Sequence, residues 1–287
     1  MKTAYICMDV ESFFDTVCIK EHNITPDTNY DCAEEVEHFL DYLNLVDVKA
    51  TFFVNVGFLD RCESILVKAR ESGHEIALHS LKHISPVEQT IEEFSGDLDD
   101  AKRIIKERLG VDVKGYRAPC FGISDEKVAA VRKRFLYDSS ALNYKDAPES
   151  GIVDLDGFKR VNDALFEDDG FYEYPVVQRR LLGKKFPISG GGYVRLMAWW
   201  LIRRAIFRHI KRSNGYMFYV HPFEISTKEF PKYKGLGFWN SVYINKGRKS
   251  YFKKIKSIIE ELKKEGYSFK TMSQSCEGND GGERKDK

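Results

Sequence analysis

The sequence has 287 residues and lacks several patterns that would assign a protein to a class at once. Its six cysteines include no Cys-x-x-Cys pair, which excludes a zinc ribbon and a thioredoxin-like redox motif. No uninterrupted apolar run reaches about 18 residues, so no membrane-spanning helix is expected. The net charge is only +1, and such a balance gives no general reason to expect a nucleic-acid partner.

The first residues also lack the pattern of a secretory signal. "MKTAYICMDVESFFD" carries acidic residues and has neither a long apolar core nor a small-residue cleavage site. We therefore expect a cytoplasmic protein whose cysteines are reduced thiols.

Enough apolar residues are present, 43% of the chain, to bury one large core. Short β-branched or aromatic runs, such as residues 3–10 and 49–55, alternate with amphipathic stretches. The longest predicted helix covers residues 86–110, with Pro86 near its start and Gly110 at its end. Strands that alternate with helices predict an α/β fold with a parallel sheet, either open or closed into a barrel.

The composition changes near the C-terminus. Residues 276–287 are charged, rich in glycine and free of aromatic side chains, so they are predicted to be a disordered tail. A single domain is expected over residues 1–275.

Polar side chains follow several of the predicted strands. Active sites of parallel α/β folds lie at the C-terminal ends of the strands, so these side chains are predicted to share one rim and to form a hydrolytic metal site. They are Asp9 and Glu11 after the first strand, His79 and His83 after "HEIAL", Arg117 after "VKGY", Asp138 after "FLY", and His221 with Glu224 after "YMFYV".

The histidine pair in "HSLKH" is the clearest of these signals. Residues four apart face the same way on a helical turn, so His79 and His83 could meet one ion, with a carboxylate as a third ligand and one position open for water. The spacing alone leaves an alternative open, in which both are satisfied polar residues near a helix start.

Five segments, taken together and in order, resemble the polysaccharide deacetylase (NodB-homology) family, carbohydrate esterase family 4. They are "ATFFV", "GHEIALHSLKH", "GYRAP", "YDSS" and "YVHPFEI", and the resemblance covers roughly residues 3–275. It implies a distorted (β/α) barrel with about seven parallel strands, a divalent metal that is usually zinc (Zn2+), and hydrolysis of an N-acetyl group on an amino sugar.

The resemblance also implies roles for individual residues. His79 and His83 would be metal ligands, and Asp9 would be the general base. Arg117 would orient that base, while the backbone N–H of Cys120 would face the oxyanion. His221 would be the general acid that protonates the departing amine.

The first motif departs from the usual family pattern of two adjacent aspartates, because Val10 stands at the second position. Glu11 is then the predicted third metal ligand. Residues 9 and 11 of a strand share a face while residue 10 points the other way, so Asp9 and Glu11 could both reach one ion. The longer Glu11 side chain leaves the identity and affinity of the metal open.

Four further residues are candidates for contact with the substrate. Phe121 follows the "RAPC" segment, and Asp138, Glu173 and Glu224 lie at predicted strand ends. The three carboxylates have alternatives: Asp138 could cap a helix, and either glutamate could pair with Arg117.

Residues 196–212 form a predicted basic amphipathic helix. An apolar stripe that includes Ile202, Ile206 and Ile210 lies opposite an arc with Arg204 and Arg208. The helix could be an outer barrel helix with a solvated face, or it could dock on an anionic leaflet at the inner face of a membrane.

The predicted function is therefore metal-dependent removal of N-acetyl groups from an amino sugar of a polysaccharide, peptidoglycan or lipid-linked precursor. A deformylase or deacylase of a lipid- or nucleotide-linked sugar would use the same machinery. A metal-free carbohydrate-binding protein is the rival from another class, and a membrane-associated scaffold would leave the strand-end residues unexplained. The sequence does not indicate an oligomeric state.

Overall fold

The computed structural model describes residues 1–15, 30–142, 153–181, 184–230 and 238–278. In these ranges no helix is both long and apolar enough to cross a membrane. The predicted tail 276–287 begins inside a helix, where Cys276 is buried, and its residues 279–287 lie outside the described part of the chain.

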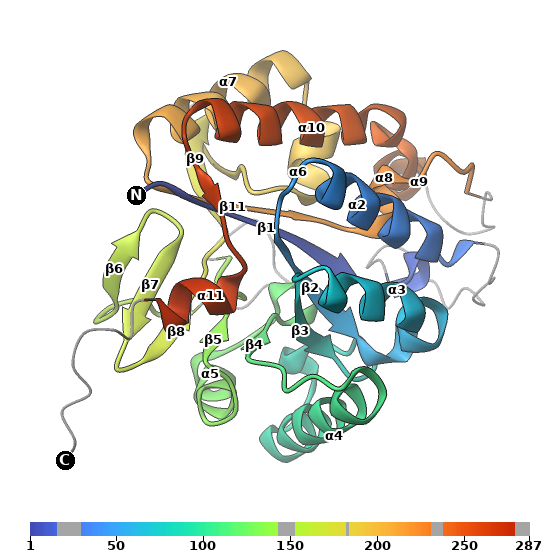
Figure 1. Cartoon of the computed structure of the whole chain (residues 1–287), viewed down its shortest axis with the longest axis vertical. Coiled ribbons are helices and arrows are strands. Elements are labelled where there is room, and N and C mark those ends of the chain that lie inside the picture. The colour runs from blue at the N-terminus through green and yellow to red at the C-terminus, as the bar shows by residue number, and fades with distance from the viewer. Residues whose placement is uncertain (16–29, 143–152, 182–183, 231–237, 279–287) are drawn as a thin grey trace.

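A curled, largely parallel sheet forms the centre of the molecule (Figure 1). Seven strands run parallel to one another, in the order β11 Gly215–Val220, β1 Thr3–Val10, β2 Ala50–Asn55, β3 Glu75–Ser80, β4 Gly115–Tyr116, β5 Tyr137–Asp138 and β8 Phe171–Glu173. This arrangement confirms the predicted α/β fold, a distorted barrel with about seven parallel strands.

Shorter strands extend the sheet or stand apart from it. They are β7 Leu165–Asp168 and β6 Lys159–Asn162, which continue antiparallel from β8, β12 Ser268–Phe269, which pairs with the start of β1, and the separate hairpin of β9 Gln178–Leu181 with β10 Lys184–Pro187. Among the described residues, no strand pairs with both β8 and β11. The barrel is therefore open there, with Ser189 accepting a hydrogen bond from Tyr219 beside the gap.

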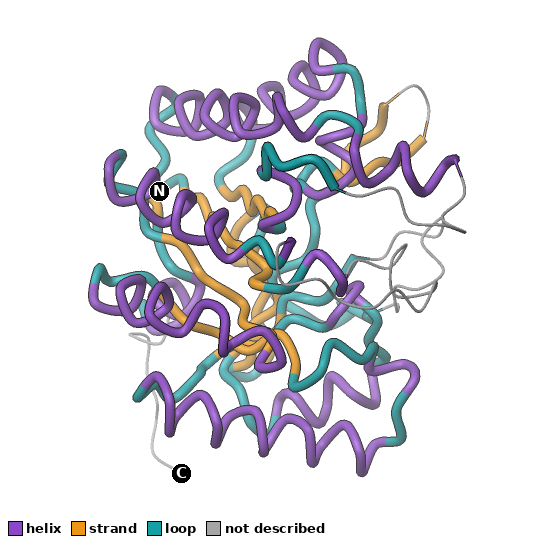
Figure 2. Tube along the Cα trace, turned by 90° about the vertical axis from the view of Figure 1, so that its right-hand side faces the viewer, coloured by secondary structure: helices purple, strands orange, loops and turns teal. Residues whose placement is uncertain are grey.

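Helices surround the strands on the outside (Figure 2). The longer ones are α2 Ala33–Leu45, α3 Leu59–Glu71, α4 Ile91–Leu109, α5 Asp125–Arg132, α7 Trp199–Arg212 and α10 Arg248–Lys264. The shorter ones are α6 Gly191–Leu196, α8 Pro222–Ile225, α9 Phe238–Asn245 and α11 Met272–Glu277. Because helices and neighbouring strands cover it on all sides, β1 is buried along its whole length.

The predicted start of the longest helix was wrong by five residues. Pro86 begins a separate 3₁₀ turn, and α4 begins at Ile91. The Thr90 side chain accepts a hydrogen bond from the Glu93 N–H, and the Glu93 carboxylate accepts one from the Thr90 N–H, which is a capping box. The predicted end was right, since Gly110 closes the helix in the left-handed conformation with φ 67°.

Gly115 tests how tightly the sheet is packed beneath the site. A Cβ placed on it would meet the ring of Tyr137 at 1.8 Å. We expect Gly115→Ala to lower the free energy of unfolding by about 1–3 kcal/mol through overpacking. Gly96 in α4 has nothing within 4 Å of such a Cβ, so Gly96→Ala should raise stability by about 0.5–1 kcal/mol. Urea denaturation of both variants measures the contrast, and equal effects would contradict this account of the packing.

Candidate metal centre and active site

The strand ends bring the predicted catalytic residues into one cavity of about 150 Å³. Asp9 comes from β1, Glu11 is the residue after this strand, His79 lies at the end of β3, and His221 is the residue after β11. Arg117 follows β4 and lies beneath the same cavity, fully buried. Residues more than 200 positions apart in sequence thus meet because β1 lies beside β11.

Glu11, His79 and His83 form a buried cluster at this rim. One carboxylate oxygen of Glu11 lies 2.7 Å from His83 Nε2 and 3.2 Å from His79 Nε2. One potential ligand atom from each residue lies within 4.8 Å of the other two. Burial opposes ionisation of Glu11, yet His83, His221 and His79 together hold its pKa well below the usual range, so it is a carboxylate.

The hydrogen bonds of His79 show that this cluster suits a cation. His79 Nδ1 lies 2.8 Å from the backbone oxygen of Arg117, and only the imidazole can donate in that bond. In a neutral ring His79 Nε2 then carries a lone pair, which faces the acceptor oxygen of Glu11. A proton or a metal ion must therefore lie between His79 Nε2 and the Glu11 oxygen. In metal-ligating histidines the other ring nitrogen typically donates a hydrogen bond that fixes the tautomer, as His79 Nδ1 does here.

A buried ion pair supports the base position. The Arg117 guanidinium donates to Asp9 Oδ1 at 2.7 Å, and neither side chain is more than 2% exposed. Arg117 also donates to the Ser139 hydroxyl and to the sulfur of Cys7. Its guanidinium carbon lies 4.1 Å from the centre of the Phe53 ring. These partners fix the orientation of the Asp9 carboxylate.

His221 stands opposite Asp9 in the cavity. Its Nε2 lies 3.7 Å from Asp9 Oδ2, and its Nδ1 lies 3.0 Å from Glu224 Oε2. Arg195 donates to the other oxygen of Glu224 at 3.0 Å. Burial lowers the pKa of His221, but the charges of Glu11, Glu224 and Asp9 outweigh burial and raise it to about 9.

The segment after Arg117 is a tight turn. Cys120 has a left-handed backbone with φ 55° and lines the cavity. The Ser140 hydroxyl accepts a hydrogen bond from the Ala118 N–H at 2.8 Å, which ties this turn to the end of β5. The role of the Cys120 N–H toward an oxyanion stays a prediction.

The four candidate substrate contacts fall into two groups. Phe121 lines the cavity as expected. Asp138, Glu173 and Glu224 are fully buried and do not line it, so the proposal that they touch substrate is corrected. Nor does either glutamate bind Arg117, since Glu224 pairs with His221 and Arg195.

Asp138 and Glu173 stand opposite each other on β5 and β8. Burial raises the pKa of Asp138 to about 6 and that of Glu173 well above its usual range. Asp138 accepts a 2.7 Å hydrogen bond from the Ser140 hydroxyl and thereby supports the turn at Ala118. The pair therefore acts beneath the cavity rather than in it.

Several cavity residues have no counterpart in the sequence-based prediction. They are Asp15, Leu142, Tyr193, Tyr219, Phe223 and Tyr243. Tyr219 and Phe223 lie in the quoted segment "YVHPFEI", and a glycine cluster, which permits close backbone approach, precedes Tyr193. A Cβ on Gly190, whose φ is 127°, would meet the Tyr219 backbone oxygen at 1.9 Å.

The fold and the strand-end residues define the class: an open (β/α) barrel with a candidate metal centre. Two family models match the chain, polysaccharide deacetylase over residues 16–138 and a domain of unknown function, DUF3473, over residues 150–277. The chain is similar to the polysaccharide deacetylase family over residues 16–138, which are less than half of its length. His221 and Glu224 lie in the segment of unknown function. The extent of a single domain over residues 1–275 stays a prediction.

Individual relatives agree with this assignment. Chitin deacetylase 1 of Cryptococcus neoformans is 36% identical over 94 residues, which are 32% of this chain and 19% of that protein. The matched part of this chain spans less than half the length of this relative and of two further curated relatives.

Two solved structures share the fold. A protein described as a polysaccharide deacetylase, from Mycobacterium smegmatis, has a TM-score of 0.62 and 19% identity, with 96% of this chain and 90% of that chain covered. A CE4 family pseudoenzyme from Bacillus anthracis has a TM-score of 0.51 and 14% identity, with 96% and 65% covered.

Replacement of Arg117 tests how much the buried Arg117–Asp9 ion pair contributes to stability. Arg117→Met would leave the Asp9 charge buried without a partner, so we expect unfolding free energy to fall by about 3–5 kcal/mol. Arg132 makes a half-exposed pair with Asp168, and Arg132→Met should cost only about 0–1 kcal/mol. Chemical denaturation compares the two, and a small loss at Arg117 would refute the importance of the buried pair.

Proposed function

We propose that the protein is a metal-dependent hydrolase that removes N-acetyl groups from an amino sugar of a glycan or glycan precursor. The observation that carries this proposal is the meeting of Glu11, His79 and His83 with Asp9 and His221 in one cavity. The name of the fungal relative, a chitin deacetylase, supports the choice of substrate class.

Glu11, His79 and His83 would hold a divalent metal, for which zinc is the first candidate because two imidazoles and a carboxylate suit it. When bound, the metal would polarise the amide carbonyl and acidify a water. The Glu/His/His set also resembles the three-ligand centres of hydrolases that keep one position open.

Asp9 would serve as the general base. Arg117 occupies Oδ1, which leaves Oδ2 on the side of the cavity that faces His221. A water between Asp9 and an amide carbon could lose its proton to Oδ2 as its oxygen attacks.

His221 would serve as the general acid. Its raised pKa, about 9, keeps the imidazole protonated near neutral pH, and Glu224 holds Nδ1 so that Nε2 is turned toward the cavity. Protonation of the departing nitrogen removes the main obstacle to amide cleavage, because an unprotonated amine is a poor leaving group. The Cys120 N–H would stabilise the tetrahedral oxyanion from the turn.

A metal-free carbohydrate-binding protein is the second candidate. The fold is shared with a pseudoenzyme, and Val10 replaces the usual second aspartate. Val10, however, is buried in the core while Glu11 joins the histidines, so Glu11 supplies the carboxylate that Val10 lacks.

Elemental analysis distinguishes the two candidates. Protein purified without added metal should carry about one divalent ion per chain, and Glu11→Ala and His79→Ala should each lose most of it, because three ligands set the affinity. His38→Ala is the matched control, since His38 lies on α2 and packs on Phe252. The rate of acetate release from N-acetylated chitooligosaccharides should fall in each variant in proportion to its loss of bound metal. If the parent protein binds no metal even with added zinc, the hydrolase proposal fails.

The pH dependence of kcat/KM tests His221. A general acid works below its pKa, so activity should fall as pH rises through the raised pKa of His221. Glu224→Gln removes one charge that raises this pKa, and the alkaline limb should move to lower pH. Glu88→Gln, on an exposed turn residue, should leave the limb in place. An unmoved limb in Glu224→Gln would show that another group is the acid.

A further inference from the structure

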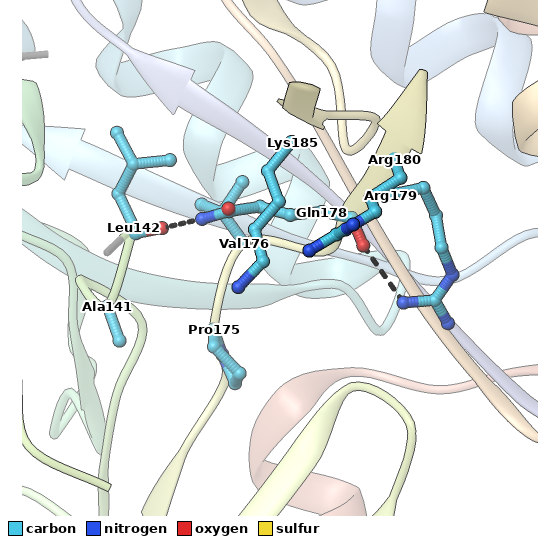
Figure 3. Close-up of a pocket in the computed structure, with 8 residues that line it drawn as sticks. All are labelled: Ala141, Leu142, Pro175, Val176, Gln178, Arg179, Arg180 and Lys185. Carbon is cyan, nitrogen blue, oxygen red and sulfur yellow. Dashed lines mark hydrogen bonds between the residues drawn. The ribbon is translucent and has the colours of Figure 1, made fainter. Parts of the chain in front are cut away.

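A second hollow of about 580 Å³ adjoins the catalytic cavity and is lined by cations (Figure 3). Among the described residues that line it, Arg179, Arg180 and Lys185 are the charged ones, and none carries a carboxylate. Figure 3 shows the side chains of Arg180 and Lys185 pointing into the hollow from the two strands of the hairpin. Leu142 lines both the hollow and the catalytic cavity, so the two spaces are neighbours at this residue.

A third hollow of about 650 Å³ continues from the second. Arg179 and Arg180 line both, and helix α7 adds Arg204, Arg208 and Arg212. Its one carboxylate belongs to Asp163, which already pairs with Arg160 and accepts a hydrogen bond from the Asn214 N–H. We call the second and third hollows together the basic groove.

The charges of the basic groove repel one another. Lys185 lies directly opposite Arg180 in the register of the β9–β10 hairpin. Arg204, Arg208 and Arg212 recur four residues apart on α7, where like charges are neighbours. Like-charge pairs destabilise both hairpins and helices.

Outside the basic groove, several helix arginines are neutralised by ion pairs with nearby carboxylates. Arg103 and Arg108 on α4, for example, each make two ion pairs with carboxylates. In the described part of the chain, Arg180, Lys185, Arg204, Arg208 and Arg212 have no carboxylate within ion-pair distance. A chain whose net charge is only +1 therefore concentrates unneutralised cations beside its catalytic cavity.

The apolar side of α7 is already used. Ile202, Ile206 and Ile210 are buried in the core, so this face is unavailable for insertion into a membrane. The basic arc of the helix lines the groove instead. This arrangement favours a ligand that enters the groove over a flat lipid surface.

We propose that the basic groove binds a phosphate or diphosphate group attached to the saccharide substrate. Guanidinium groups match phosphate oxygens with paired hydrogen bonds, and several arginines can share one diphosphate. The groove adjoins the catalytic cavity at Leu142, so one ligand can place its anion in the groove and its N-acetyl group in the cavity. This inference rests on the proposed function for the identity of the sugar.

Binding of N-acetylglucosamine 1-phosphate to the full chain tests the groove. We expect Arg204→Gln combined with Arg208→Gln to weaken binding of this probe by about tenfold or more in calorimetry, because two charged hydrogen-bond donors are lost. Arg203→Gln combined with Lys211→Gln removes the same charge from the same helix, outside the groove, and should leave binding at the parental level. N-acetylglucosamine without phosphate should bind the parent and both variants alike.

The outcomes separate the anion site from the proposed activity. Equal binding of the phosphate probe by the groove and control variants would overturn the inference, even if the protein releases acetate. Loss of probe binding in the groove variant alone supports the site, even if no variant or parent releases acetate and the proposed function fails. If the parent protein does not bind N-acetylglucosamine 1-phosphate but binds phosphatidylglycerol vesicles through Arg204 and Arg208, the groove is a membrane-binding surface and the inference is wrong.

Discussion

One buried guanidinium connects the parts of this site. Arg117 is fully buried, and its donors reach Asp9 and Cys7 on β1 and Ser139 after β5. Its backbone oxygen holds the His79 ring, so the candidate base and one candidate ligand depend on the same residue. A buried charge is tolerated only where such partners compensate for lost hydration. The burial of Cys7, which raises its pKa to about 12, keeps that partner a neutral thiol.

The site draws on both segments recognised by family models. Arg117 and the histidine pair lie in the first matched segment, and the candidate base Asp9 and Glu11 precede it, while His221 and its partner Glu224 belong to the segment of unknown function. Parallel pairing of β11 with β1 brings them together. The second segment therefore completes the candidate active site, and the proposed role of His221 as general acid would give it a chemical reason to accompany the first.

Charge is sorted by sign around the cavity. Carboxylates of Asp9, Glu11 and Asp15 surround the space where a cation would bind, whereas the basic groove begins beyond Leu142. Because field strength falls off within about 10 Å in physiological salt, each region acts on the part of a ligand that lies in it. A substrate with a neutral amide at one end and an anion farther along matches both regions.

The sequence by itself determined the α/β class and most of the residues that meet at the rim, because parallel strands bring their C-terminal ends to a common edge; the number of parallel strands was implied only by the family resemblance. It also indicated Glu11 rather than Val10, since side chains alternate across a strand. It did not determine that Asp138, Glu173 and Glu224 lie behind the cavity, that Arg195 holds Glu224, or that the hairpin places Lys185 against Arg180. These features depend on contacts between residues distant in the chain, whose burial and partners only the tertiary structure decides.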